Sequence, residues 1–444
     1  MRNEDIAYAV SKLRVLHVNK RYPPHVGGVE KHLQDLARAQ AERPGVQVEV
    51  LCVAEGAVAP APDHSRLSAR CRPTRSPTPA GGWERDGRVG VLRLPEVGVV
   101  ASNPLAWGLC PTLCRRAARD AHDVWHFHYP FPSGELALLG MSRLRPRPPL
   151  VCTYHSDPLG ESGLKRTLSG AYALLTRGFL QEVDAVIVSS PKLATASRFL
   201  PAVEGKVHVI PFGIDPIPLR ATPEVAAAAA DLRRRWGSPL VLFVGRLVPY
   251  KGVEVLLRAL PAVRRGAVVI VGEGPLHGSL LETAQRMGVA ERVVFVGPLD
   301  QGSLAAAYHA ADVFVLPSVT PNEAFGLVQL EAHACGLPVI STDLPTGVPF
   351  ANRHGVSGLV VPPGDAQALA GALNRLLEDD VLRRRLGAQA RERFQRDFSL
   401  QRMTDHVLEL YEDVAAGRGS AGAPPRRWVW SSAPENLPRP GRVS

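Results

Sequence analysis

The sequence predicts an α/β protein with two domains, each built around a parallel β-sheet. Short apolar runs rich in β-branched residues alternate with amphipathic stretches along most of the chain, as expected for strands that helices cover on both faces. The chain has 444 residues, which is too long for one ordinary core and fits two domains of similar size. Its composition, 45% hydrophobic and 21% charged, is typical of a folded globular protein.

The expected strands form two series. The first series comprises residues 14–20, 48–54, 90–95, 123–129, 150–156, 185–190 and 207–213. The second comprises residues 240–246, 267–273, 292–298, 312–318, 338–342 and 358–363. Between them, residues 211–224 carry several prolines, which is typical of an interdomain hinge. We therefore expect Rossmann-like domains over residues 1–215 and 216–397.

Composition also assigns three other segments. Residues 56–86 are rich in Pro, Ala, Ser and Arg without periodicity, which indicates a loop insertion in the first domain. Residues 398–416 have the pattern of one amphipathic helix, with Ser399 placed to cap it. Residues 417–444 are rich in Pro, Gly, Ser and Arg, so we expect a disordered tail.

The chain carries a formal charge of +10, which favours an anionic partner such as nucleic acid, an anionic lipid surface or a phosphorylated substrate. Nucleic acid is disfavoured because the sequence lacks zinc-finger spacing and an RNP signature, and only 6% of its residues are aromatic. The sequence has neither an apolar run long enough to span a membrane nor a signal peptide. We therefore expect a cytoplasmic protein whose six cysteines are reduced.

Two motifs place glycines and cations at the ends of expected strands. In PPHVGGVEKH, Gly27 and Gly28 lie between the first strand and the first helix, where a ligand anion could approach the backbone. A purely structural turn is the alternative. In GRLVPYKG, Arg246 and Lys251 follow a strand at the carboxyl edge of the sheet and suit a diphosphate. The alternative is a pair of solvated surface cations.

A third motif, EAFGLVQLE, combines two carboxylates with the start of a helix. Glu323 follows an expected strand, and Phe325, Gly326 and Leu327 open a helix whose backbone N–H groups could cradle a phosphate. Glu331 lies about five residues further on, or ~7 Å along the helix, which suits a ribose next to a pyrophosphate. Alternatively, Glu331 bonds within its helix and Glu323 is a surface residue.

Three histidines follow or end strands of the first domain. His155 in TYHSDP lies at a carboxyl strand edge with Ser156 and Asp157, where these side chains could contact an acceptor and handle a proton. His126 and His128 in WHFHYP are acceptor-binding candidates too, and core packing explains them equally well. A metal site is a competing interpretation, but the spacing is not that of a zinc helix and no Asp-x-Asp element follows a strand. We expect no metal.

Taken in order, GGVEKH, TYHSD, GRLVPYKG and EAFGLVQLE resemble the motifs of glycosyltransferase family 4, the retaining enzymes of the GT-B fold, over residues 12–415. The resemblance implies two Rossmann-like domains that face each other across a cleft. It further implies that the N-terminal domain binds the acceptor and the C-terminal domain the nucleotide sugar. The helix at 398–416 then corresponds to the crossover that packs back on the N-terminal domain.

The resemblance also implies roles for single residues. Arg246 and Lys251 resemble the pair that neutralises the donor diphosphate, Glu323 the carboxylate that contacts the transferred sugar, and Glu331 the ribose ligand. Such enzymes keep the anomeric configuration without an obvious enzymic nucleophile, by front-face attack of the acceptor while the diphosphate leaves. Catalysis then depends on positioning and on electrostatic stabilisation of the leaving group, and no cofactor is expected besides the nucleotide sugar as co-substrate.

For the first domain, the resemblance implies that His155 lies beside the anomeric centre and that Gly28 lets the domain close on the phosphates. After TYHSD the chain departs from the family pattern, with PLGESGLKR in place of a more basic run. Lys165 and Arg166 could serve the acceptor there. Together with Arg177, they could instead place an otherwise apolar helix on an anionic membrane.

TYHSD, FVLPS and EAFGLVQLEAHACGLPVIST together resemble bacterial mannosyl- or rhamnosyl-type transferases that build surface polysaccharides or glycolipids. That implies a hexose such as mannose, a GDP-sugar as the first donor to test, and a glycan or polyprenyl-linked acceptor. Two alternatives stay open: a catalytically silent donor-binding scaffold, and an epimerase or phosphorylase of similar architecture. The complete motif set argues against the silent scaffold.

Overall fold

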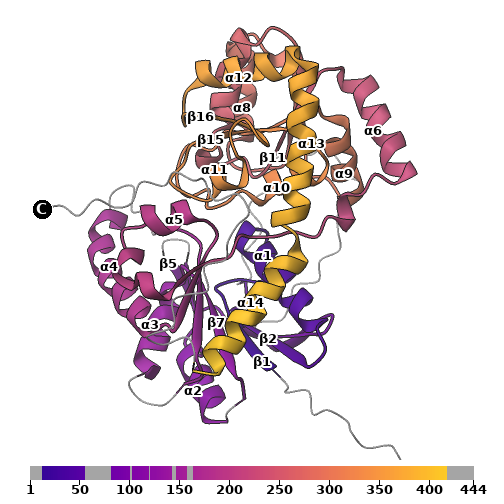
Figure 1. Ribbon diagram of the computed structural model, residues 1–444. Coiled ribbons are helices and arrows are strands. Elements are labelled where there is room, and N and C mark those ends of the chain that lie inside the picture. The colour runs from indigo at the N-terminus through magenta and orange to yellow at the C-terminus, as the bar shows by residue number, and fades with distance from the viewer. Residues whose placement is uncertain are drawn as a thin grey trace, which may run out of the picture.

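The computed structural model describes residues 13–55, 82–100, 103–119, 121–142, 147–157 and 164–417. Within them the chain forms two lobes, and each lobe holds a mainly or fully parallel sheet flanked by helices (Figure 1). The first sheet has the order β10-β9-β8-β7-β1-β2-β4-β3 and the second β13-β12-β11-β14-β15-β16. The expected α/β architecture with two Rossmann-like sheets is confirmed.

The first lobe contains ten strands and five α-helices among the described residues. Its strands are β1 (Leu13–Val18), β2 (Val46–Val53), β3 (Gly82–Asp86), β4 (Val89–Leu94), β5 (Gly98–Val100), β6 (Asn103–Leu105), β7 (Val124–Tyr129), β8 (Leu150–Tyr154), β9 (Ala185–Val188) and β10 (Val207–Val209). Its helices are α1 (Gly28–Ala41), α2 (Leu109–Ala118), α3 (Pro132–Ser142), α4 (Leu164–Glu182) and α5 (Pro191–Ala196).

The second lobe follows the hinge. Its strands are β11 (Leu240–Val244), β12 (Ala267–Val271), β13 (Val293–Gly297), β14 (Val313–Leu316), β15 (Val339–Thr342) and β16 (Gly358–Val361). Its helices are α6 (Pro223–Trp236), α7 (Val253–Ala259), α8 (His277–Arg286), α9 (Gln301–Ala310), α10 (Leu327–Ala334), α11 (Val348–Ala351), α12 (Ala366–Glu378) and α13 (Asp380–Asp397). All thirteen strands expected from the sequence are present to within a few residues, because continuous apolar runs form strands buried on both faces.

The expected loop over residues 56–86 is wrong at its C-terminal end. Residues 82–86 form β3, which pairs antiparallel with β4 at the edge of the first sheet. Its sequence, GWERD, has no apolar alternation because an edge strand is exposed to solvent. Residues 56–81 lie outside the described part of the chain. The short hairpin of β5 and β6 was not predicted either.

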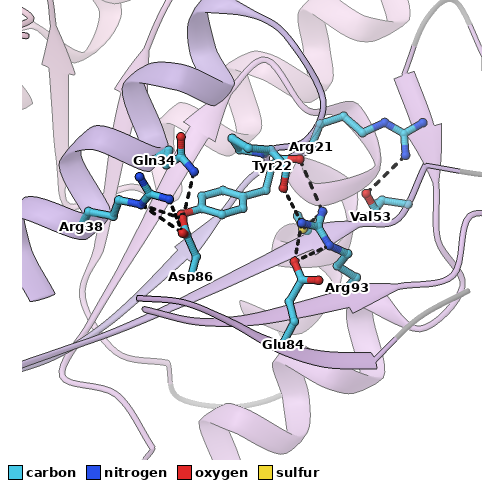
Figure 2. Close-up of polar contacts among 10 residues, drawn as sticks. Arg21, Tyr22, Gln34, Arg38, Val53, Glu84, Asp86 and Arg93 are labelled. Atoms are coloured by element: carbon cyan, nitrogen blue, oxygen red, sulfur yellow. Dashed lines mark hydrogen bonds and ion pairs between the residues drawn. The ribbon is translucent and has the colours of Figure 1, made fainter. Parts of the chain in front are cut away.

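Polar contacts fasten β3 and β4 to α1 (Figure 2). Asp86 in β3 accepts hydrogen bonds from the Tyr22 hydroxyl at 2.7 Å and from Gln34 and Arg38 at 3.0 Å. The buried Arg93 in β4 donates to Glu84 at 2.7 Å and to the Tyr22 carbonyl at 3.4 Å. This hairpin therefore holds the loop that leads from β1 into α1.

A final helix, α14 (Leu400–Ala415), returns to the first lobe and lies against α1 and β7 (Figure 1). Ser399 caps it by accepting the Arg402 N–H at 3.3 Å, as expected. Just before the cap, the hinge and the crossover bond to each other, from the Ile214 N–H to the Phe398 carbonyl at 3.1 Å and from the Leu400 N–H to the Ile214 carbonyl at 3.0 Å. The two connections between the lobes are thus joined.

Among the described helices, none is both long and apolar enough to cross a membrane. Residues 418–444 of the expected tail lie outside the described part.

Candidate active site at the lobe junction

The two lobes meet where Phe212 of the hinge packs against Phe325, with ring centroids 5.2 Å apart. We call this region the lobe junction. An ion pair between Lys192 of α5 and Asp343 of the second lobe also crosses it. The carboxyl ends of parallel strands from both sheets point here, which is where open α/β sheets bind ligands.

The glycine pair begins α1, with Gly27 as the cap residue and Gly28 as the first helical residue. A Cβ atom on Gly27 would lie 2.2 Å from a carboxylate oxygen of Glu30, whereas one on Gly28 would meet no atom within 4 Å. The structure therefore explains Gly27 by close packing and leaves open space beside Gly28 at the positive end of the helix dipole.

Lys251 and Glu323 form a buried ion pair at the carboxyl edge of the second sheet. The Lys251 Nζ lies 2.6 Å from Glu323 Oε2, and the Ser318 hydroxyl donates to the same oxygen at 2.8 Å. Burial acts to lower the pKa of the Lys251 ammonium, but the Glu323 carboxylate outweighs it and raises that pKa. Lys251 therefore keeps its charge in this pair, and because Glu323 is buried, the alternative of a surface carboxylate is wrong.

Arg246 lies exposed beside this pair. Its positive charge opposes that of Lys251 and acts to lower the pKa of the lysine. Two cations thus converge on one point of the sheet edge, and only Lys251 is balanced by Glu323. Such an arrangement suits a ligand with more than one negative charge.

The helix α10 starts directly after this pair. Gly326 has φ of 74°, a left-handed conformation that glycine adopts without strain, and a Cβ there would lie 2.5 Å from Leu316. The Phe325 ring is buried in the lobe junction, so its side chain packs rather than facing a donor. Only the backbone of residues 325–327 remains a candidate for phosphate contact.

Glu331 lies on α10, within reach of the first lobe. Its Oε2 accepts a hydrogen bond from Tyr308 of α9 at 2.7 Å, so the alternative of a bond within its own helix is wrong. Burial raises the pKa of Glu331, whereas the Tyr308 hydroxyl and the charge of Lys31 on α1 act to lower it. The carboxylate is therefore held by α9, and as a carboxylate it has capacity to accept a further hydrogen bond.

His126 and His128 lie deep in the first lobe and have almost no exposed surface. The Nδ1 of His126 bonds the Tyr411 hydroxyl of α14, and its Nε2 lies 2.6 Å from the Thr153 hydroxyl. The Nε2 of His128 lies 3.1 Å from Nδ1 of His17. Because their ring nitrogens are engaged inside the protein, the expected acceptor contacts do not fit these two residues, and the core interpretation holds.

His155 lies at the end of β8 beside the lobe junction. Its ring centroid is 5.3 Å from that of Phe212 and 5.5 Å from that of His32. Two neighbouring histidines were not predicted from the sequence: His32, and His17, which lies opposite His126 in the register of β1 and β7. The contacts of His32 with His155 and of His17 with His126 join segments far apart in the chain, so no local sequence pattern predicts them.

Asp157 is held by protein groups on both oxygens. Its Oδ1 accepts from the Tyr154 hydroxyl at 2.7 Å and from the Ser197 hydroxyl at 2.6 Å, and its Oδ2 accepts from the Arg198 N–H at 3.1 Å. Asp157 therefore ties β8 to the segment after α5, and the expected acceptor contact does not fit it. The acceptor role of the half-buried Ser156 stays a prediction.

Burial lowers the pKa of all five clustered histidines. The pKa falls to about 4 for His17 and to about 3 for His32, and it lies well below 6.5 for His126, His128 and His155. These rings are therefore neutral near pH 7, and each carries one N–H donor and one bare nitrogen acceptor.

His17, His126 and His128 could in principle hold a metal, since one nitrogen of each lies within 4.8 Å of the others. The nitrogens in question also bond to neighbouring protein groups. These nitrogens thus take part in a hydrogen-bond network among the described side chains, and the expectation that no metal binds stays a prediction.

Comparison with known proteins identifies the family and the fold. The profile described as "Glycosyl transferase 4-like domain" matches residues 27–213, and "Glycosyl transferases group 1" matches residues 227–393. The O-antigen chain mannosyltransferase C of Escherichia coli is 32% identical over 400 residues, which cover 90% of this chain and 98% of that protein. This chain belongs to glycosyltransferase family 4. It is therefore an enzyme, a glycosyltransferase.

Two further proteins are similar to this chain, one in sequence and one in structure. D-rhamnosyltransferase WbpZ of Pseudomonas aeruginosa is 35% identical over 289 residues, which cover 64% of this chain and 72% of that one. The structure of sucrose-phosphate synthase from Thermosynechococcus elongatus matches with a TM-score of 0.73 at 26% identity, over 91% of this chain and 100% of that one. The fold of this glycosyltransferase is GT-B.

Proposed function

We propose that this glycosyltransferase is a retaining enzyme that moves a hexose, mannose or a similar sugar, from a nucleoside diphosphate sugar to a glycan or lipid-linked acceptor of a surface polysaccharide or glycolipid. The observation that carries the proposal is the buried pair of Lys251 and Glu323, with Arg246 beside it and the start of α10 next to it. Two cations, a helix start and a carboxylate match a diphosphate attached to a sugar.

In this proposal the donor diphosphate forms ion pairs with the ammonium of Lys251 and the guanidinium of Arg246. Glu323 then turns from its lysine to hydroxyl groups of the transferred sugar, and Glu331 accepts from the ribose. The ion pair with the buried Lys251 is strengthened by its low-dielectric surroundings and helps to hold the leaving group. The neutral imidazole of His155 offers the sugar a hydrogen bond without adding a charge.

The reaction then proceeds on one face of the sugar. The acceptor hydroxyl oxygen forms the new bond to the anomeric carbon while the bond from that carbon to the diphosphate oxygen breaks. The acceptor proton passes to the departing diphosphate. Because the acceptor bonds on the face from which the diphosphate leaves, the configuration at the anomeric carbon is kept. Lys251 and Arg246 stabilise the charge that develops on the diphosphate, and we propose that no metal is needed.

The relatives support a mannose-like sugar, since their names specify mannosyl and D-rhamnosyl transfer. A guanosine donor is the first to test. The panel consists of GDP-mannose, GDP, UDP-glucose and ADP-glucose, each tested for protection against thermal unfolding, and the three nucleotide sugars are also tested for sugar transfer. The proposal predicts protection and turnover with at least one nucleotide sugar, and loss of turnover in Glu323→Gln.

The same panel separates the alternatives. Protection by a nucleotide sugar without turnover on any glycan or lipid acceptor would favour a silent scaffold. Release of free sugar would indicate an epimerase-type reaction, and a requirement for inorganic phosphate would indicate a phosphorylase. Full transfer by Glu323→Gln would overturn the role given to this carboxylate.

We further propose that the enzyme works in the cytoplasm, attached peripherally to the inner face of the membrane. Five large apolar residues are exposed in one short segment around the β5–β6 hairpin: Val97, Val99, Val100, Leu105 and Trp107. The Trp107 side chain is 84% exposed, and tryptophan favours the membrane interface. On α4, Leu174 and Arg177 are exposed as well, while the side chains of Lys165 and Arg166 lie outside the described set.

The membrane proposal is tested by sedimentation with vesicles of phosphatidylglycerol and phosphatidylethanolamine at low salt. The wild-type protein is expected to sediment, and the double variant Val99→Ser/Trp107→Ser to stay in the supernatant. Val381→Ser, at an exposed apolar position on α13, is the matched control and should sediment like the wild type. Failure of the wild type to sediment would remove the proposal.

A further inference from the structure

The buried histidines form one continuous hydrogen-bonded chain from the lobe junction into the first lobe. The Nε2 of His155 lies 3.5 Å from Nδ1 of His128, whose Nε2 lies 3.1 Å from Nδ1 of His17. The Nε2 of His17 lies 2.7 Å from Oε1 of Gln40 on α1. His128 and His17 thus each use one ring nitrogen for the preceding neighbour and the other ring nitrogen for the following one.

Gln40 differs from the histidines of this hydrogen-bonded series. Its amide nitrogen only donates and its amide oxygen only accepts, whereas either imidazole nitrogen can carry the proton. Gln40 is fully buried, and its amide oxygen faces His17 while its Nε2 donates to the Tyr411 hydroxyl of α14 at 3.3 Å. An amide oxygen only accepts, so His17 must carry its proton on Nε2. Its Nδ1 is then bare and accepts from Nε2–H of His128.

The proton position of His17 fixes those of the next two rings, up to the lobe junction. With its proton on Nε2, His128 leaves Nδ1 bare, and this atom accepts from Nε2–H of His155. The bare nitrogen of His155 is then Nδ1. All three rings hold their proton on the same atom, and the orientation of one amide sets that choice.

The second arm of Gln40 is satisfied by the same orientation. The Tyr411 hydroxyl accepts from Nε2 of Gln40 and donates to Nδ1 of His126. Nε2–H of His126 donates in turn to the Thr153 hydroxyl at 2.6 Å. Turning the amide over would reverse every bond in both arms together, so the network has two states and Gln40 selects between them.

We propose that Gln40 is a positioning residue that fixes the tautomer of His155, so that His155 keeps its proton on Nε2, towards His128, and presents bare Nδ1 as an acceptor at the lobe junction. The role of His155 towards the donor sugar rests on the proposed function, whereas its tautomer does not. An acceptor at this position receives a hydrogen bond from a sugar hydroxyl; the opposite tautomer would donate one.

The test is 15N NMR of the full-length protein labelled at histidine, near pH 7.5, with the His155 signals assigned by comparison with His155→Gln. Nε2–H and Nδ1–H tautomers give well-separated nitrogen shifts, and the proposal predicts an Nε2–H tautomer for His155 in the wild type. In Gln40→Met, which keeps the side-chain length and removes both amide groups, the shifts should move towards a mixture of tautomers. Gln34→Met, on the same helix but outside the network, should leave them unchanged.

An Nδ1–H tautomer for His155 in the wild type would overturn the proposal, and this result does not depend on whether Gln40→Met folds. Unchanged His155 shifts in folded Gln40→Met would also overturn it, as would a stoichiometric metal found in the purified protein and lost in His126→Gln. Absence of sugar transfer would contradict the proposed function and leave the tautomer result standing. Where transfer is seen, kcat/KM of Gln40→Met should fall about tenfold, the value of one hydrogen bond.

Discussion

The Nζ atom of Lys251 lies 2.6 Å from Oε2 of Glu323, and both residues are buried. Before a donor binds, these two charges balance each other. Removing one partner of a buried pair leaves the other charge without compensation, which typically costs about 3–5 kcal/mol. The pair therefore affects both stability and the proposed chemistry, and these two effects can be separated.

We expect Lys251→Met to lower the free energy of unfolding by about 3 kcal/mol and to abolish donor protection. The double variant Lys251→Met/Glu323→Gln should recover most of the stability, because no unpaired charge remains, yet it should stay inactive. Urea unfolding and a transfer assay measure the two effects. The exposed pair Glu254 and Arg258 is the control, and Arg258→Met should cost about 0.5 kcal/mol or less. A double variant that regains transfer would contradict the assigned roles.

Glu331→Gln should change apo stability and donor binding in opposite directions. Burial raises the pKa of Glu331, so the charged form is disfavoured in the folded protein, and a neutral amide that still accepts from Tyr308 should keep or raise the melting temperature. Loss of the charged acceptor for the ribose should weaken donor binding about tenfold or more. Thermal unfolding with and without the donor measures both, and unchanged donor affinity would exclude a ribose contact.

Gly213→Ala should separate the two connections between the lobes. A Cβ at this position would lie 2.3 Å from the Ser399 carbonyl oxygen, so the hinge must move away from the crossover. We expect a loss of a few kcal/mol, as is typical for overpacking against backbone (about 1–3 kcal/mol). Gly205→Ala, where a Cβ would meet no atom within 4 Å, should be nearly neutral. Equal unfolding midpoints in urea for the two variants would refute the close contact.

Lowering the pH should destabilise the protein through its buried histidines. Burial lowers the pKa of His17 to about 4 and that of His32 to about 3, against about 6.5 in an unfolded chain. Below about pH 6.5 the unfolded state therefore binds protons that the folded state does not, and each such histidine lowers the free energy of unfolding by about 1.4 kcal/mol per pH unit. The effect is absent above pH 7 and grows as the pH falls towards 4.

His32→Leu tests this dependence at one residue. Neither ring nitrogen of His32 has a hydrogen-bond partner among the described residues, so the substitution removes a titrating group without breaking a bond. Between pH 6.5 and 5 the variant should lose about 2 kcal/mol less than the wild type. His354→Leu, at an exposed position, controls for the loss of a histidine. Parallel pH profiles for His32→Leu and the wild type would contradict the buried neutral state.

The sequence predicted those parts of the molecule that local patterns determine. Apolar β-branched runs such as those of β11 and β14 predict buried strands. Ser399 before an amphipathic run predicts the cap of α14. The β3 strand went unrecognised because Trp83 and its charged neighbours lie on an exposed edge. Its pairing is set by β4 and α1, which a local window does not contain.

Tertiary contacts account for the differences at the site. Lys251 and Glu323 were both expected at one sheet edge, but their pairing without a ligand depends on how the loops after β11 and β14 meet. His17 and His32 carry no signal of their own and become significant only beside His126, His128 and His155. Likewise, Asp157 was expected to contact the acceptor, because the sequence does not show that Tyr154, Ser197 and Arg198 already bond to its carboxylate.

The most direct test of the central claim is the anomeric configuration of the product, followed by 1H NMR during transfer from the nucleotide sugar that best protects the protein against thermal unfolding. We predict that the first-formed glycoside has the same configuration at the anomeric carbon as the donor, and that Glu323→Gln forms none. A product of inverted configuration, or the same rate with Glu323→Gln as with the wild type, would contradict the account.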